Sequence, residues 1–143
     1  MSLTDEQRAF ADSHRVARLA TSGAGGEPHV IPICYALDGE RFYFVVDEKP
    51  KATRSGLKRL RNLIENPRAA IVVDDYDDDW ARLAYLLVRG PASIVGDDAE
   101  YERVLALLRS RYRPYASMPL RRETHPMVRI DAEHVHFWRW SRT

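Results

Sequence analysis

The sequence has one cysteine, Cys34, among its 143 residues, so an internal disulfide is excluded. No apolar run approaches the roughly 20 residues that a membrane-spanning helix needs, and the first residues show no basic segment followed by an apolar one. We therefore expect no membrane partner and no secretion. A single thiol also fits a reducing compartment, and we expect a cytoplasmic protein.

The chain lacks a strong excess of charge of either sign. Its formal net charge is +1 and its sequence pI is about 7.9, whereas domains that bind nucleic acids are usually strongly basic. We expect no nucleic-acid partner. Hydrophobic residues make up 45% and charged residues 30% of the chain, as in ordinary globular proteins. The length predicts a single domain covering residues 1–143.

Motifs for metal binding or nucleophilic catalysis are also missing. Residues 74–79 contain five aspartates but neither the glycine nor the distal glutamate of a calcium-binding loop. His134 and His136 share one strand face without a third ligand, so no metal site is predicted. Cys34 has no partner base beside it, and the glycines of 22–26 lack phosphate-loop spacing.

What the sequence does contain is a concentration of positive charge between Val45 and Arg68, although the chain as a whole is nearly neutral. At about 100° per residue, Arg54, Lys58 and Arg61 fall within one arc of a predicted helix that ends at Asn66-Pro67. A solvated amphipathic helix is one interpretation of this pattern. The other is an anion-binding site.

The remaining pattern predicts mostly strands. Thr4 and Gln7 form a capping box for a helix that runs to about Ser13. Asp38-Gly39 is a tight-turn signal, and Gly90-Pro91 predicts a bend or barrel corner within 80–95. Strands are expected at 16–21, 29–37, 41–46, 69–74, 80–95, 127–130 and 134–140, with a second helix over 97–112 and a surface loop over 113–125.

Pro32 lies inside one predicted strand and cannot donate to a ladder, which implies a sheet edge or a bulge. Backbone groups left unpaired at such an edge are free to meet a flat ligand. We expect this ligand to lie against the backbone of Ile31, Pro32, Ile33 and Cys34.

The order of these elements resembles the split β-barrel of the pyridoxamine 5'-phosphate oxidase-like superfamily. The resemblance rests on residues 28–34, 46–51, 57–63, 66–68 and 74–80, and covers the chain from about Val16 to Trp140. It is strongest with a branch of probable coenzyme F420-dependent enzymes. Where the superfamily usually has a lysine eight residues before the helix-ending proline, this chain has Arg59.

The resemblance implies a mainly β fold, a split β-barrel with flanking helices that binds FMN or F420, and a homodimer with sites at the subunit interface. It implies an F420-dependent oxidoreductase that transfers hydride between the deazaflavin and a small conjugated substrate. An FMN-binding oxidoreductase and a non-catalytic flavin- or haem-binding protein are the alternatives. No catalytic dyad is required, because the cofactor carries the reactive carbon. Tyr35, Tyr115 or water could supply a proton, and the sequence does not choose.

The residues implied to contact the cofactor come from several segments. The phosphate and acidic tail of F420 suit the cationic segment, and Trp80 or Trp138 would form an apolar wall. The expected cationic contacts are Lys49, Lys51, Arg54, Lys58, Arg59 and Arg61.

Overall fold

A computed structural model of the protein describes residues 3–47 and 54–142, with the backbone alone for 54–57. Strands dominate it, as expected. The elements are α1 (Asp5–Asp12), β1 (Ala17–Ser22), β2 (Pro28–Ile33), β3 (Ala36–Asp38), β4 (Arg41–Val45), α2 (Arg54–Glu65), β5 (Arg68–Asp75), η1 (Trp80–Arg82), β6 (Ala84–Ile94), α3 (Asp98–Arg111), η2 (Arg113–Ser117), β7 (Met127–Asp131) and β8 (His134–Arg139).

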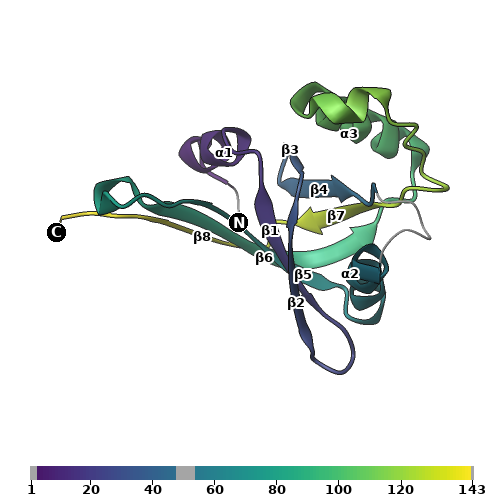
Figure 1. Ribbon diagram of the computed structural model, residues 1–143, viewed down its shortest axis with the longest axis horizontal. Helices are drawn as coiled ribbons and strands as arrows, with labels where there is room; N and C mark the ends of the chain where they lie inside the picture. Colours follow the sequence, from purple (N-terminus) through teal and green to yellow (C-terminus); the bar gives the residue numbers. More distant parts are fainter. Residues whose placement is uncertain (1–2, 48–53, 143) are drawn as a thin grey trace.

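The strands form one antiparallel, curled sheet (Figure 1). Its order is β2-β1-β5-β6-β7-β4-β3, and β8 pairs with β6 beside this path. The long strand β6 joins the two parts of the sheet, because it pairs with β5 up to Pro91 and with β7 from Ala92 onward. A β-carbon at Gly90 would overlap the carbonyl oxygen of Asp131, so only glycine fits where the strand turns. The predicted corner is confirmed.

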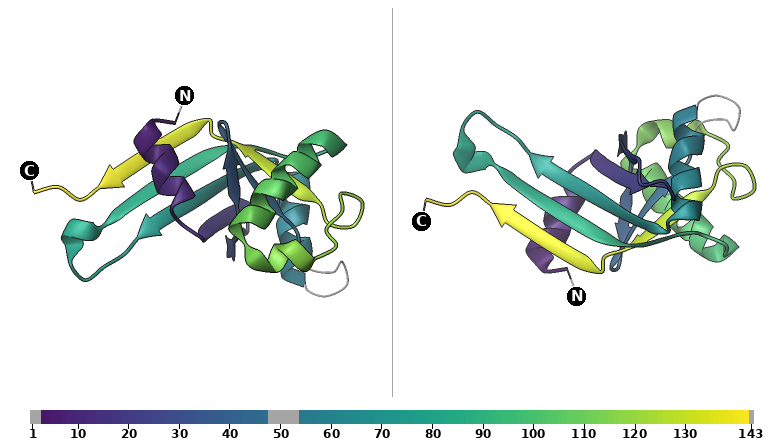
Figure 2. Two further views of the ribbon diagram at one scale, coloured as in Figure 1. Left: turned by 90° about the horizontal axis from the view of Figure 1, so that it is seen from above. Right: turned by 90° about the horizontal axis from the view of Figure 1, so that it is seen from below.

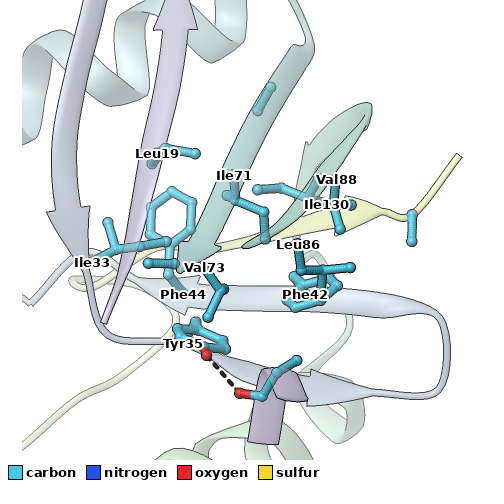
Figure 3. Close-up of a cluster of buried hydrophobic side chains, with 14 of the residues drawn as sticks. Leu19, Ile33, Tyr35, Phe42, Phe44, Ile71, Val73, Leu86, Val88 and Ile130 are labelled. Atoms are coloured by element: carbon cyan, nitrogen blue, oxygen red, sulfur yellow. Dashed lines mark hydrogen bonds between the residues drawn. The ribbon is translucent and has the colours of Figure 1, made fainter. Parts of the chain in front are cut away.

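The core has two parts, and β4 separates them. Phe42 and Phe44 point into the cluster inside the curled sheet (Figure 3), which Leu19, Ile71 and Leu86 also fill. Tyr43 and Val45 alternate with them and point into a second cluster beneath α3. Because β4 is buried on both faces, its sequence is a continuous apolar run rather than an alternating one.

Two of the predicted strands have boundaries that differ from those expected. The strand expected over 29–37 is broken at Cys34 and Tyr35, because the backbone N–H of Tyr35 donates to the hydroxyl of Tyr112 (3.0 Å) and its carbonyl accepts from Arg111 (2.8 Å). These hydrogen bonds take the place of the strand-to-strand hydrogen bonds that would continue the sheet. Residues 80–82 form a short 3-10 helix, because the side chain of Asp79 accepts from the backbone of Ala81. The predicted capping box and the Gly39 turn are both confirmed.

Side chains of α3 fasten that helix to the sheet. Glu100 accepts hydrogen bonds from Tyr43 (2.6 Å) and from Arg129 (2.8 Å), a set we call the Glu100 network. Burial alone would raise the pKa of Glu100, but these hydrogen bonds outweigh it and lower that pKa. At the other end of α3, Arg111 donates to the carbonyls of Asp12, His14 and Tyr35.

The segment over 113–125 is not simply a surface loop. Tyr115 and Leu120 are buried in the second cluster, and the guanidinium of Arg109 donates to the carbonyls of Tyr115 (3.1 Å) and Met118 (2.9 Å). This anchoring places the ring of Tyr115 near the end of β2.

One face of the sheet formed by β5, β6 and β8 is not covered by any helix of the described chain (Figure 2, right). Its half-buried and exposed side chains include Val72, Tyr85, Leu87 and Trp138. No helix within the described residues is long and apolar enough to cross a membrane.

Candidate functional site

A cavity of about 270 Å³ opens at the C-terminal end of β2, between β2, β4, α2 and η2. Most of its wall is apolar. The lining residues are Val16, Pro32, Ile33, Cys34, Phe44, Val45, Asp47, Arg59 and Tyr115. The cavity therefore brings together Pro32, Ile33, Cys34 and Arg59, four of the residues that the sequence predicted.

The β2 side of the cavity is a sheet edge. β2 is the terminal strand of the sheet and pairs with β1 alone within the described residues. Pro32 stands opposite Arg18 and carries no N–H, so the prediction of an edge is confirmed. Ile31 is half-buried against the core and does not line the cavity.

Arg59 is the cation of the cavity wall. It lies on the core-facing side of α2, where its side chain is 5% exposed. Its guanidinium carbon is 5.8 Å from the ring centroid of Phe44, which places the charge over an aromatic face. A guanidinium held in an apolar wall is weakly screened by water and presents planar donors to an anion.

Two other predicted cations of α2, Lys58 and Arg61, do not line this cavity. Lys58 is half-buried, and Arg61 is exposed on the outer side of the helix. The side chain of Arg54 and all of Lys49 and Lys51 lie outside the described residues. Residues 48–53 nevertheless connect Asp47, in the cavity wall, to the first turn of α2.

The polar side of the cavity is a hydrogen-bonded cluster that the sequence did not predict as a unit. The hydroxyl of Tyr115 donates to Oδ2 of Asp47 at 2.6 Å. Burial, this hydrogen bond and the negative charge of Asp47 raise the pKa of Tyr115. Burial also raises the pKa of the Cys34 thiol, and the neighbouring hydroxyl of Tyr115 partly offsets the increase.

The two tryptophans do not reach the cavity of their own chain. Trp80 lies in η1 and is 62% exposed, and Trp138 in β8 stacks on Tyr85 with 5.9 Å between ring centroids. β6 and β8 run out together to the end of the molecule opposite α2 (Figure 1). A wall made by either tryptophan would have to come from a second chain.

No group of three or more potential metal ligands occurs among the described residues. Aspartates of 74–79 instead take part in ion pairs and loop hydrogen bonds. Asp74 pairs with Arg18 at 3.2 Å, and Asp77 accepts from the backbone of Asp79 at 2.7 Å.

The fold is a split β-barrel. It consists of a curled antiparallel sheet with flanking helices, and a cavity lies at one open edge of the sheet. The chain belongs to the pyridoxamine 5'-phosphate oxidase family, whose sequence model matches residues 3–139. The resemblance noted in the sequence is thereby confirmed at the level of the family and the fold.

Individual relatives include enzymes. A 5a,11a-dehydrotetracycline/5a,11a-dehydrooxytetracycline reductase of Streptomyces rimosus is 36% identical over 75 residues, which are 52% of this chain and 51% of that protein. The match thus spans about half the length of this curated relative. Among solved structures, the conserved hypothetical protein Rv2991 of Mycobacterium tuberculosis has a TM-score of 0.75 and 25% identity, covering 96% of this chain and 85% of that one. An F420 reductase has a TM-score of 0.68 and 25% identity, covering 94% and 98%.

Proposed function

We propose that the protein is an oxidoreductase that binds coenzyme F420 and transfers hydride between this deazaflavin and a small conjugated organic substrate. The observation that carries the proposal is Arg59, a buried cation in the apolar wall of a cavity at an unpaired strand edge. The F420 reductase and the dehydrotetracycline reductase among the similar proteins support the same reaction class.

The cavity fits part of such a cofactor. Its volume of about 270 Å³ suits a fused ring system rather than a complete cofactor with its tail. Pro32 and Ile33 would lie along one side of the ring and Phe44 on another. The phosphodiester and the glutamates of F420 would extend towards Arg59 and the basic segment that follows Asp47.

When bound, the deazaflavin supplies a carbon that donates or accepts hydride. The chain's own residues hold and orient it: Arg59 neutralises negative charge, the β2 edge offers backbone groups, and the apolar side chains exclude water. FMN carries one phosphate, so the dense cationic segment favours the more acidic deazaflavin.

Cofactor choice is tested by titrating the purified chain separately with F420 and FMN. We expect micromolar or tighter binding of F420 and at least tenfold weaker binding of FMN. Micromolar binding of FMN with no binding of F420 would assign the protein to FMN chemistry. Turnover is tested by mixing the protein with reduced F420 and 5a,11a-dehydrotetracycline, because a non-catalytic binding protein does not reoxidise the cofactor.

We further propose that two chains pair through the uncovered face of β5, β6 and β8. Val72, Tyr85 and Leu87 form an apolar centre on it, with the Arg18–Asp74 ion pair at one side. Pairing would cover this centre and bring Trp80 or Trp138 of one chain to the cavity of the other.

Sedimentation equilibrium tests the pairing. Leu87→Glu should convert a dimer to a monomer and weaken F420 binding with it, because part of the cavity wall is lost. Ala106→Glu, at an exposed position of α3, is the matched control and should change neither. A monomeric wild-type protein with full F420 affinity would contradict the shared site.

A further inference from the structure

Tyr35 and Tyr115 occupy different environments, although either could supply a proton on the basis of sequence alone. The hydroxyl of Tyr35 donates to the carbonyl of Ala11 at 2.6 Å, and its side chain is 1% exposed in the core (Figure 3). It does not line the cavity. Tyr115 does, so it is the one of the two that a molecule in the cavity can touch.

The other polar groups of the cavity wall are less suited to delivering a proton. Arg59 is a cation that would hold negative charge of the cofactor. The Cys34 thiol lines the cavity as well, and burial raises its pKa. Tyr115 donates to Asp47 at 2.6 Å, and Asp47 is half-exposed, so the phenol has a route to solvent.

We propose that Tyr115 is the proton donor of the reaction and that Asp47 positions its hydroxyl and links it to water. The proposal rests on the proposed function. As hydride reaches the β-carbon of a conjugated ketone, the electron pair of the C=C bond moves to give an enolate. The O–H bond of Tyr115 then breaks while a C–H bond forms at the α-carbon, and the tyrosinate recovers its proton from water beside Asp47. The substrate gains one hydride and one solvent-derived proton.

The surroundings of Tyr115 agree with this step. Burial and the carboxylate of Asp47 raise the pKa of Tyr115, so the phenol stays protonated until a strong base forms next to it. An enolate is such a base. The tyrosinate formed beside a carboxylate is itself strongly basic, which favours its rapid reprotonation by water.

The test compares Tyr115→Phe with Tyr35→Phe in the full chain, with 2-methylcyclohex-2-enone as the conjugated ketone, because its α-carbon becomes a stereocentre on protonation. Single-turnover transfer from reduced F420 should slow about 100-fold or more in Tyr115→Phe, the usual range for loss of a general acid. Tyr35→Phe should stay within about threefold of wild type, and F420 affinity should change less than about threefold in both variants. In D₂O, the product of the wild type should carry deuterium on one face of the α-carbon, and that of Tyr115→Phe on both.

A measurement without cofactor checks the geometry independently. The neighbouring hydroxyl of Tyr115 lowers the pKa of the Cys34 thiol, so iodoacetamide should alkylate Cys34 with a pH profile displaced upward in Tyr115→Phe and unchanged in Tyr35→Phe.

Two results would overturn the assignment while leaving the proposed function intact: full activity of Tyr115→Phe, or loss of activity in Tyr35→Phe in its place. Failure of the wild type to reoxidise reduced F420 would instead remove the proposed function, and this proposal with it.

Discussion

Replacing Arg59 with methionine tests the central electrostatic argument. Methionine keeps the unbranched apolar stem of the side chain but removes the charge from a position that is 5% exposed. A hydrogen bond to a charged group contributes about 1.5–3 kcal/mol. Because about 1.4 kcal/mol corresponds to a tenfold change in Kd, Arg59→Met should weaken F420 binding by roughly 10- to 150-fold.

The assay is a fluorescence titration of F420 with the wild type, Arg59→Met and Arg61→Met. Arg61 is two residues away on the same helix but exposed, so its substitution should cost less than about threefold at moderate ionic strength. Urea unfolding completes the comparison. This measurement separates a loss of F420 affinity in a folded protein from a loss that follows destabilisation, because removal of one charged group from a buried interaction can itself destabilise a protein.

Normal F420 binding by Arg59→Met, together with a large loss in Arg61→Met, would refute the reasoning. The anion would then lie on the outer arc of α2 and not in the cavity. Equal losses in both variants would indicate nonspecific attraction to a basic helix. If Arg59→Met unfolded at a lower urea concentration than the wild type, the guanidinium would also contribute to folding stability.

Three further substitutions test how the scaffold is held together. Glu100→Gln should cost about 3 kcal/mol of unfolding free energy at pH 7, because it removes the charge from the Glu100 network. The folded-state pKa of Glu100 is lowered, so the stability that its charge contributes is present above the unfolded pKa of about 4.3 and is lost as pH falls through the folded value. Urea unfolding at several pH values should therefore show a smaller loss of stability in acid for Glu100→Gln than for the wild type. Arg111→Met should cost about 3 kcal/mol by the same measurement, since one guanidinium serves three carbonyls. Gly90→Ala should cost more than about 4 kcal/mol because its β-carbon would overlap the Asp131 carbonyl, whereas Gly96→Ala, with open space around it, should be nearly neutral.

The features that the sequence predicted well are those with local steric causes. The Thr4 capping box, the Gly39 turn, the edge position of Pro32 and the bend at Gly90 each follow from the geometry of a few consecutive residues. Each of these features depends on residues within one turn or one strand. Contacts with the rest of the chain therefore change it little.

The break between β2 and β3 has a distant cause. The local residues favour a continuous strand, and the hydrogen bonds that interrupt it come from Arg111 and Tyr112, 76 and 77 residues further along the chain. The polar side of the cavity has the same origin, since Asp47 and Tyr115 are 68 residues apart. Neither contact is marked by a periodic or turn-like pattern, so the sequence alone does not reveal it.

Arg59 shows what helical periodicity could have revealed and did not. The arc of Arg54, Lys58 and Arg61 follows the polar side of the helix that the sequence predicts. Arg59 instead precedes Asn62 by three residues and Leu63 by four, and both of these are buried, so it occupies a core position of an amphipathic helix. A charge at such a position is weakly screened by water. Helical periodicity therefore picks out Arg59 as a cation of α2 that faces the cavity, whereas Arg61 on the polar arc faces solvent.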